Sequence, residues 1–149
     1  MLFRSEYRGV SFGMKGDALF CKLLSGRKLT YHRPRLIPDR TPWGKEVLKI
    51  TYEGRDGYTW ARTDTYGGKL TENIVQATAR DIPAHALVTV HAAGHLPVLH
   101  VHDEIVAEIP EGQGSVEEVE ALMCDLPDWC KDWPLRAAGG WRGKRYRKD

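Results

Sequence analysis

Three consecutive polar residues, His102, Asp103 and Glu104, are the strongest candidates for chemistry in this 149-residue sequence. Short runs rich in β-branched residues flank them, at 98–101 and 105–107, and each run favours a strand. The triplet therefore falls where one predicted strand turns into the next. Two adjacent carboxylates repel each other there, and a hard divalent cation would offset the repulsion because it prefers carboxylate oxygens. A solvated hairpin turn, where Asp and Glu are common, is the alternative interpretation.

A long helix is the main element expected to support this hairpin. Apolar residues recur at spacings of three and four between positions 70 and 93, which predicts one buried face. Pro83 lies inside this pattern and predicts a kink or local break, because proline lacks an amide donor and clashes with the preceding turn. Gly94 is expected to cap the end of the helix. Ser115 predicts the N-cap of a shorter second helix.

Strands are expected on both sides of these helices. Alternating residues and turn signals predict strands at 18–23, 28–33, 47–52 and 58–62. Pro34 is expected to end the second of them. Trp60 is expected to cover the core, and residues 135–138 are expected to form a final edge strand. The order predicts an α+β fold, with a long helix and a shorter C-terminal helix on an antiparallel sheet, in a single domain over residues 1–149.

Composition argues against several classes of protein. No run of roughly 18 apolar residues is present, so no membrane span is expected, and no secretory signal is expected at the N-terminus. Three cysteines without CxxC spacing fit reduced thiols in a cytoplasm. The net charge is only +2, but basic residues gather in two clusters that suit a polyanion or a plain solvated surface. The clusters are Arg27, Lys28, Arg33, Arg35 and Arg40, and Arg136, Arg142, Lys144, Arg145, Arg147 and Lys148.

Two further groups of side chains have the chemistry of a binding site. Four histidines, His91, His95, His100 and His102, suggest zinc or nickel, although the first two lack the intervening glutamate of a zincin. Surface histidines are the alternative. Asn73 and Gln76 carry neutral amides that suit the base and sugar edges of a nucleic-acid minor groove. Ordinary exposed helix positions are the alternative for these two residues.

Four segments resemble, in the same order, segments of phage-type family A DNA polymerases. Residues 24–31 resemble a Leu-Pro-Ser-Gly-Arg segment, and residues 63–81 resemble the helix that precedes motif C. Residues 101–106, Val-His-Asp-Glu-Ile-Val, resemble motif C itself, and residues 139–146 resemble the C-terminal end. Each piece alone is unspecific, but their joint order covers nearly the whole chain.

The resemblance implies part of a polymerase palm subdomain. Asp103 matches the motif C carboxylate that helps to hold the two Mg²⁺ ions of nucleotidyl transfer, and Glu104 supports that site. His102 would lie beside the primer end. Gln76 matches a glutamine that contacts primer-template DNA, and Arg27 and Asn73 are further expected DNA contacts. Bacterial repair polymerases have an asparagine where this chain has Glu72, one residue before Asn73.

Several parts of the family pattern are missing from the sequence. It has no motif A, no fingers motif B and no exonuclease motif, so the chain is expected to be inactive alone and to need an upstream polymerase chain. Because the sequence begins at Met1, we expect the chain to be a split subunit, a prophage remnant or an expressed fragment. The expected location is the cytoplasm of a bacterial host or a phage-infected cell.

A rival expectation follows from the same residues. The chain is alternatively a non-catalytic DNA-binding or protein-interaction remnant of a prophage polymerase, with Asp103 idle. In either case, surface that normally meets the rest of a polymerase would be exposed. Self-association is therefore expected on a face carrying Leu48, Ile50 and Trp60.

Overall fold

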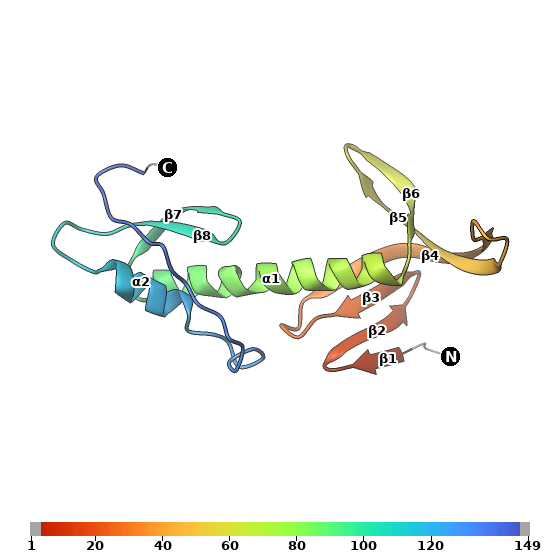
Figure 1. The fold of residues 1–149 in the computed structure, drawn as a ribbon, viewed down its shortest axis with the longest axis horizontal. Coiled ribbons are helices and arrows are strands. Elements are labelled where there is room, and N and C mark those ends of the chain that lie inside the picture. The colour runs from red at the N-terminus through yellow and green to blue at the C-terminus, as the bar shows by residue number, and fades with distance from the viewer. Residues whose placement is uncertain (1–3, 147–149) are drawn as a thin grey trace. The chain divides into compact units, whose positions relative to one another are not determined.

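The computed structural model describes residues 4–146, so Arg147 and Lys148 of the second basic cluster lie outside the described residues. The chain divides into two compact units, Met1–Thr78 and Ala79–Asp149. Helix α1 (Gly67–Ala92) begins in the first unit and ends in the second (Figure 1). The structure is α+β, with antiparallel sheets and two helices, and a single domain over residues 1–149 remains a prediction. Neither helix in the described part is long and apolar enough to cross a membrane.

The first unit contains a six-stranded antiparallel sheet in which each strand pairs with the next along the chain. Its strands are β1 (Arg4–Tyr7), β2 (Val10–Lys15), β3 (Ala18–Lys22), β4 (Lys28–Arg40), β5 (Glu46–Asp56) and β6 (Thr59–Thr65). Five short connections, of two or five residues each, make this order possible without any crossover. The four strands predicted at 18–23, 28–33, 47–52 and 58–62 are therefore confirmed in existence, with longer bounds for the last three.

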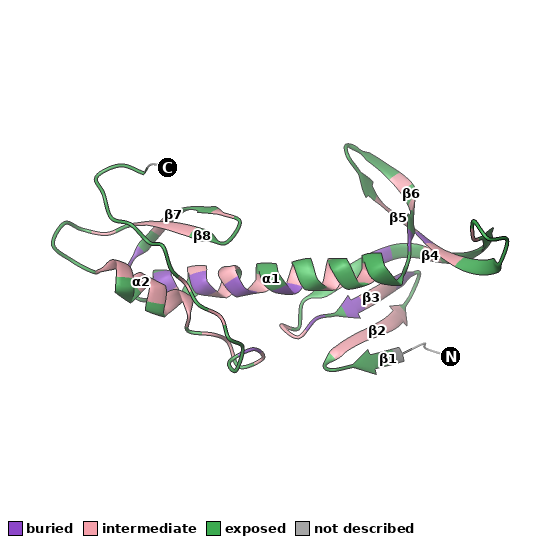
Figure 2. Ribbon diagram, in the orientation of Figure 1, coloured by how far each residue is buried: buried purple, intermediate pink, exposed green. Residues whose placement is uncertain are grey.

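One face of this sheet packs against the first half of α1. Cys21, Leu23 and Tyr31 are buried there, and partly buried apolar residues of α1 pack against them (Figure 2). Those α1 residues are Leu70, Ile74 and Ala77. Because the side chains of a strand alternate between its two faces, the neighbours of Cys21 and Tyr31 point away from the helix.

Strand β4 continues to Arg40, so the prediction that Pro34 ends it is wrong. The pairing with β5 shifts register between His32 and Arg35, and Arg33 has a positive φ of 43°, which together mark a β-bulge. Proline is tolerated at bulges and on edge strands, because no ladder hydrogen bond is lost there. Pro38 meets the second condition, since β3 pairs only with residues 28–32 of β4.

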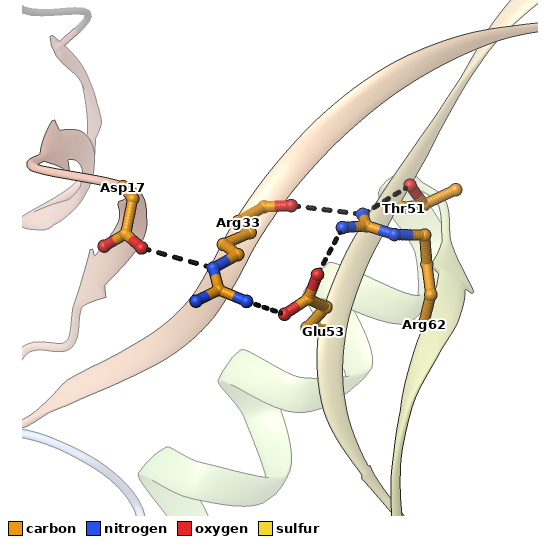
Figure 3. Close-up of polar contacts among 5 residues, drawn as sticks. All are labelled: Asp17, Arg33, Thr51, Glu53 and Arg62. Carbon is orange, nitrogen blue, oxygen red and sulfur yellow. Dashed lines mark hydrogen bonds and ion pairs between the residues drawn. The ribbon is translucent and has the colours of Figure 1, made fainter.

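An ionic network holds this bulge in place (Figure 3). The guanidinium of Arg62 donates to the Arg33 carbonyl and to Oγ1 of buried Thr51, both at 3.1 Å, and to Glu53 at 2.8 Å. The Arg33 guanidinium lies 2.9 Å from the other Glu53 oxygen and 3.5 Å from Asp17. Partial burial raises the pKa of Glu53, but the two guanidinium groups outweigh it and hold that pKa below its ordinary value.

The register of β5 and β6 corrects two predictions about exposed apolar residues. Trp60 pairs with Arg55 and is 61% exposed, so it does not cover the core. Leu48 and Ile50 are at even positions of β5, whereas Arg55 and its partner Trp60 belong to the opposite face. The prediction that Leu48, Ile50 and Trp60 share one face is therefore wrong.

The second unit contains the end of α1, the hairpin of β7 (Leu96–Val101) and β8 (Glu104–Glu108), and α2 (Val116–Met123). Ile82, Ala86 and Val90 are buried, as their spacing predicts. The helix continues through Pro83, so the predicted local break is wrong, and the alternative, a kink, stays a prediction. The carbonyl that loses its partner there belongs to exposed Ala79, where water is available to replace the missing amide.

The ends of the helices follow the expected chemistry, but the C-terminal segment does not. Ser115 caps α2, since its hydroxyl accepts the Glu118 amide at 3.0 Å, and Gly94 follows α1 with φ of 93°. Residues 135–138 are not a strand, which makes that prediction wrong. The Ala137 amide instead donates to Cys124 Sγ at 3.1 Å, so this segment is tied to the end of α2.

We predict that Glu53→Gln lowers stability at neutral pH, because Arg33 and Arg62 lose their shared carboxylate. A depressed folded-state pKa gives stability that is present at neutral pH and lost as the pH falls through it. The difference between wild type and variant should therefore narrow below pH 4.5, the ordinary value for this carboxyl. The midpoints of urea unfolding of both proteins, at a series of pH values from about 7 to about 3, measure this difference in stability. Glu46→Gln, which removes an exposed ion pair with Arg40, is the matched control and should change stability by less than ~0.5 kcal/mol.

Candidate functional site

The His102-Asp103-Glu104 triplet lies at the turn of the β7–β8 hairpin. Val101 pairs with Glu104, which leaves His102 and Asp103 as a two-residue loop, and all three polar residues are exposed. The predicted strands on both sides are confirmed. A tight loop on paired strands holds the Asp103 carboxylate at one end of a defined hairpin, where it is open to solvent.

The backbone of His102 has a left-handed conformation, with φ of 53°. Three other two-residue turns of this chain have a positive φ at the same position: two have glycine there, Gly16 and Gly57, and the third has Arg8. A side chain in this region of φ costs about 1–3 kcal/mol unless the surroundings fix it, and such residues cluster at functional sites. His102 therefore occupies a position where glycine would relieve strain.

Tyr146 reaches the same turn from the C-terminal segment. Its hydroxyl donates to Glu104 Oε1 at 3.2 Å, and its ring stacks with Trp141 at a centroid distance of 6.5 Å. Partial burial raises the pKa of Tyr146, and the neighbouring carboxylate raises it further. Sequence reasoning gave Tyr146 no role, because the contact joins residues 42 positions apart. No described residue makes a comparable contact with the carboxylate of Asp103.

The four histidines do not form a metal centre in the described part of the chain. No group of three or more His, Cys, Asp and Glu residues lies close enough to hold a metal ion between residues 4 and 146, which argues against the zinc or nickel interpretation. His95 is 8% exposed, and its Nε2 lies 3.4 Å from Glu118 Oε1 of α2. The other three are exposed. His95 therefore joins the end of α1 to α2.

The predicted DNA-contacting residues outside the hairpin meet around one turn of α1 in the first unit. The Arg27 guanidinium donates to the Ala77 carbonyl at 2.6 Å, and the Asn73 amide donates to the Tyr31 hydroxyl at 3.3 Å. Both contacts tie the helix to the sheet. Gln76, between them in sequence, is exposed. Gln76 and Arg27 are thus exposed, whereas Asn73 is partly buried.

We predict that His102→Gly stabilises the second unit by about 1 kcal/mol, because glycine adopts a positive φ without steric cost. Urea denaturation followed by circular dichroism measures the change. Gly57→Ala is the converse control. A Cβ at Gly57 meets no atom within 4 Å, but the φ of 58° is unfavourable for alanine. The free energy of unfolding should therefore fall by about 1 kcal/mol. A loss of stability in His102→Gly would mean that the imidazole itself supports the turn.

Comparison with known proteins finds similarity to phage DNA polymerases. The chain is 46% identical over 142 residues to a DNA polymerase of Bacillus phage SP02, in an alignment that covers 95% of this chain and 21% of that protein. DNA polymerases of Mycobacterium phages D29 and L5 are 38% and 37% identical over 55 and 54 residues, which is 34% of this chain and 9% of each relative. No family model and no solved structure matches. The chain thus spans about a fifth of the length of the SP02 relative and is similar to one segment of a phage DNA polymerase.

Proposed function

We propose that this chain supplies the C-terminal palm portion of a phage-type family A DNA polymerase and is inactive without an upstream chain bearing motifs A and B. The observation that carries this proposal is the 46% identity to the SP02 DNA polymerase, because it extends over 95% of the chain rather than over one motif. The similar part is 21% of that protein, which agrees with a subunit or portion that lacks the remaining motifs.

In this proposal Asp103 is a ligand of Mg²⁺ and Glu104 supports it. Their donor chemistry fits, since both are exposed carboxylates on adjacent residues of one turn. Magnesium bound there would supply activation of the primer 3′-hydroxyl and charge stabilisation at the pyrophosphate leaving group. Tyr146 holds Glu104 by one oxygen, which leaves Asp103 as the carboxylate without a partner among the described residues. The remaining ligands would come from the upstream chain.

Contacts to primer-template DNA are assigned to residues from both units. Gln76 has an exposed amide that suits the minor groove, and His102 would lie beside the primer end. Arg27 and Asn73 hold the helix against the sheet, so their contribution to DNA binding would be mainly to position Gln76. The rival function is a non-catalytic DNA-binding remnant, in which Asp103 does nothing.

We predict that primer extension appears only when the chain is mixed with the part of the SP02 polymerase outside the alignment, primed template, nucleotides and Mg²⁺. Asp103→Asn should then lower the extension rate by about a thousandfold, since loss of a metal ligand removes several kcal/mol of transition-state stabilisation. Asp128→Asn changes an exposed carboxylate away from the hairpin and should leave the rate unchanged. Full activity of Asp103→Asn would favour the non-catalytic function, and no extension by the mixture would sink the split-enzyme proposal.

The outer part of the β4–β5 ribbon is the surface that we propose the upstream chain covers. Beyond residues 28–32, β4 pairs with β5 alone, and two-stranded ribbons are marginal in water. One side of this ribbon is apolar and pairs Leu36 with Ile50 and Pro38 with Leu48. Leu36 and Leu48 are 63% and 65% exposed.

We predict that the chain without its partner self-associates through this ribbon. Sedimentation over a range of concentrations should show species larger than a monomer, because exposed apolar patches of this kind favour association. Leu48→Lys should shift the distribution toward monomer, whereas Tyr58→Lys, at an exposed turn residue, should not. A wild-type chain that stays monomeric at high concentration would contradict this role of the ribbon.

A further inference from the structure

The six-stranded sheet has a second face, which points away from α1, and we call it the open face. Leu19, Cys21, Leu29 and Tyr31 all belong to the helix-packed face. Side chains alternate along a strand, so their neighbours along β3 and β4 lie on the open face. Directly paired residues share a face, so the pairing of β4 with β5 and of β5 with β6 identifies the open-face residues of β5 and β6. The open face carries Phe20, Lys22, Lys28, Thr30, His32, Glu53, Arg55, Trp60 and Arg62.

Aromatic rings on the open face are interleaved with cations. The Lys28 ammonium lies 6.0 Å from the centroid of the Phe20 ring, and the His32 and Trp60 rings are 5.4 Å apart. Trp60 pairs with Arg55 across the strands and is 61% exposed. A large indole next to an arginine is thus presented to solvent on a paired strand, which is a rigid support.

The charge of the open face is positive after its ion pairs are considered. Glu53 is held by Arg33 and Arg62, and Asp64 is held by Lys49. Glu6, on the outer strand β1, also has an interaction partner. Lys15 and Arg35 share this face through their pairing with Ala18 and Thr51. Within residues 4–146 no carboxylate forms an ion pair with Lys15, Lys22, Lys28, Arg35 or Arg55, although the Arg55 guanidinium donates to the Gly57 carbonyl at 2.9 Å. The charges of these five cations are therefore not neutralised by a carboxylate of the described chain.

We propose that the open face binds single-stranded nucleic acid, with a base stacked on Trp60 and phosphates on the neighbouring lysines and arginines. Unpaired bases expose their π-faces, and surfaces that bind single strands combine stacking aromatic residues with a positive track for the backbone. A protein partner fits this face less well, because its exposed residues are mostly charged, unlike the apolar side of the β4–β5 ribbon. The proposal concerns the first unit and does not rest on a role of Asp103 in catalysis.

Fluorescence anisotropy of a labelled oligothymidylate of about 16 nucleotides, titrated with the whole chain, tests this. Trp60→Ala should weaken binding by about fivefold to a hundredfold, the range expected for loss of one base stack, and Trp60→Phe should retain most of the affinity. Trp43→Ala is the matched control, since that indole is 89% exposed but lies in the loop between β4 and β5. Lys22→Ala and Lys28→Ala should each reduce the slope of log affinity against log salt by about 0.7.

Several results would overturn the proposal. Equal affinity of wild type and Trp60→Ala, or an equal loss in Trp43→Ala, would each reject it. A loss of affinity for the SP02 polymerase part in Trp60→Ala, with oligonucleotide binding unchanged, would show that the open face docks protein instead. The oligonucleotide titration contains no SP02 polymerase part, nucleotides or Mg²⁺, so failure of primer extension and failure of this binding are distinguishable.

Discussion

Burial of one apolar stripe along α1 is the constraint on which both units depend. Its first half is packed against the sheet through Leu70, Ile74 and Ala77, and its second half buries Ile82, Ala86 and Val90. Proline in a helix interior costs about 3 kcal/mol, so a continuous helix through Pro83 requires that packing of the stripe outweigh this cost. The same stripe determines which side chains stay exposed. Gln76 lies off it, and this leaves the amide available for a ligand.

The sheet acquires two chemically different faces from the same alternation. On the helix side, Tyr31 and its neighbours are buried, and the polar hydroxyl is satisfied by Asn73. On the open side, Glu53 is enclosed by two arginines, one of which also holds the carbonyl at the β4 bulge. That bulge allows one long strand to belong first to the six-stranded sheet and then to a two-stranded ribbon. The ion pairs therefore shape the sheet, and the cations left over set its affinity for anions.

The sequence predicts what depends on neighbours along the chain and misses what depends on distant ones. The Ser115 cap, the β7–β8 hairpin and most of the buried stripe of α1 are local patterns, and these are confirmed, whereas Val75, predicted on that stripe, is 60% exposed. Pro34 was misread because its tolerance depends on a bulge and on an absent third strand, neither of which is visible locally. Trp60 was misread because a strand pattern identifies alternation without saying which face is covered. The contact of Tyr146 with Glu104 spans 42 residues and has no local signal.

The hairpin turn combines two features that oppose its own stability. His102 has a positive φ of 53°, which favours glycine, and the next two residues carry adjacent negative charges. Tyr146 compensates Glu104 by one hydrogen bond, but no described residue compensates Asp103. A turn selected for stability alone would have glycine first and no paired carboxylates. Both features are explained if a cation from solution, or groups on another chain, bind at the turn. Either would offset the repulsion between the carboxylates of Asp103 and Glu104 and favour the strained backbone of His102. Folding of this hairpin and binding of its missing partner would then stabilise each other.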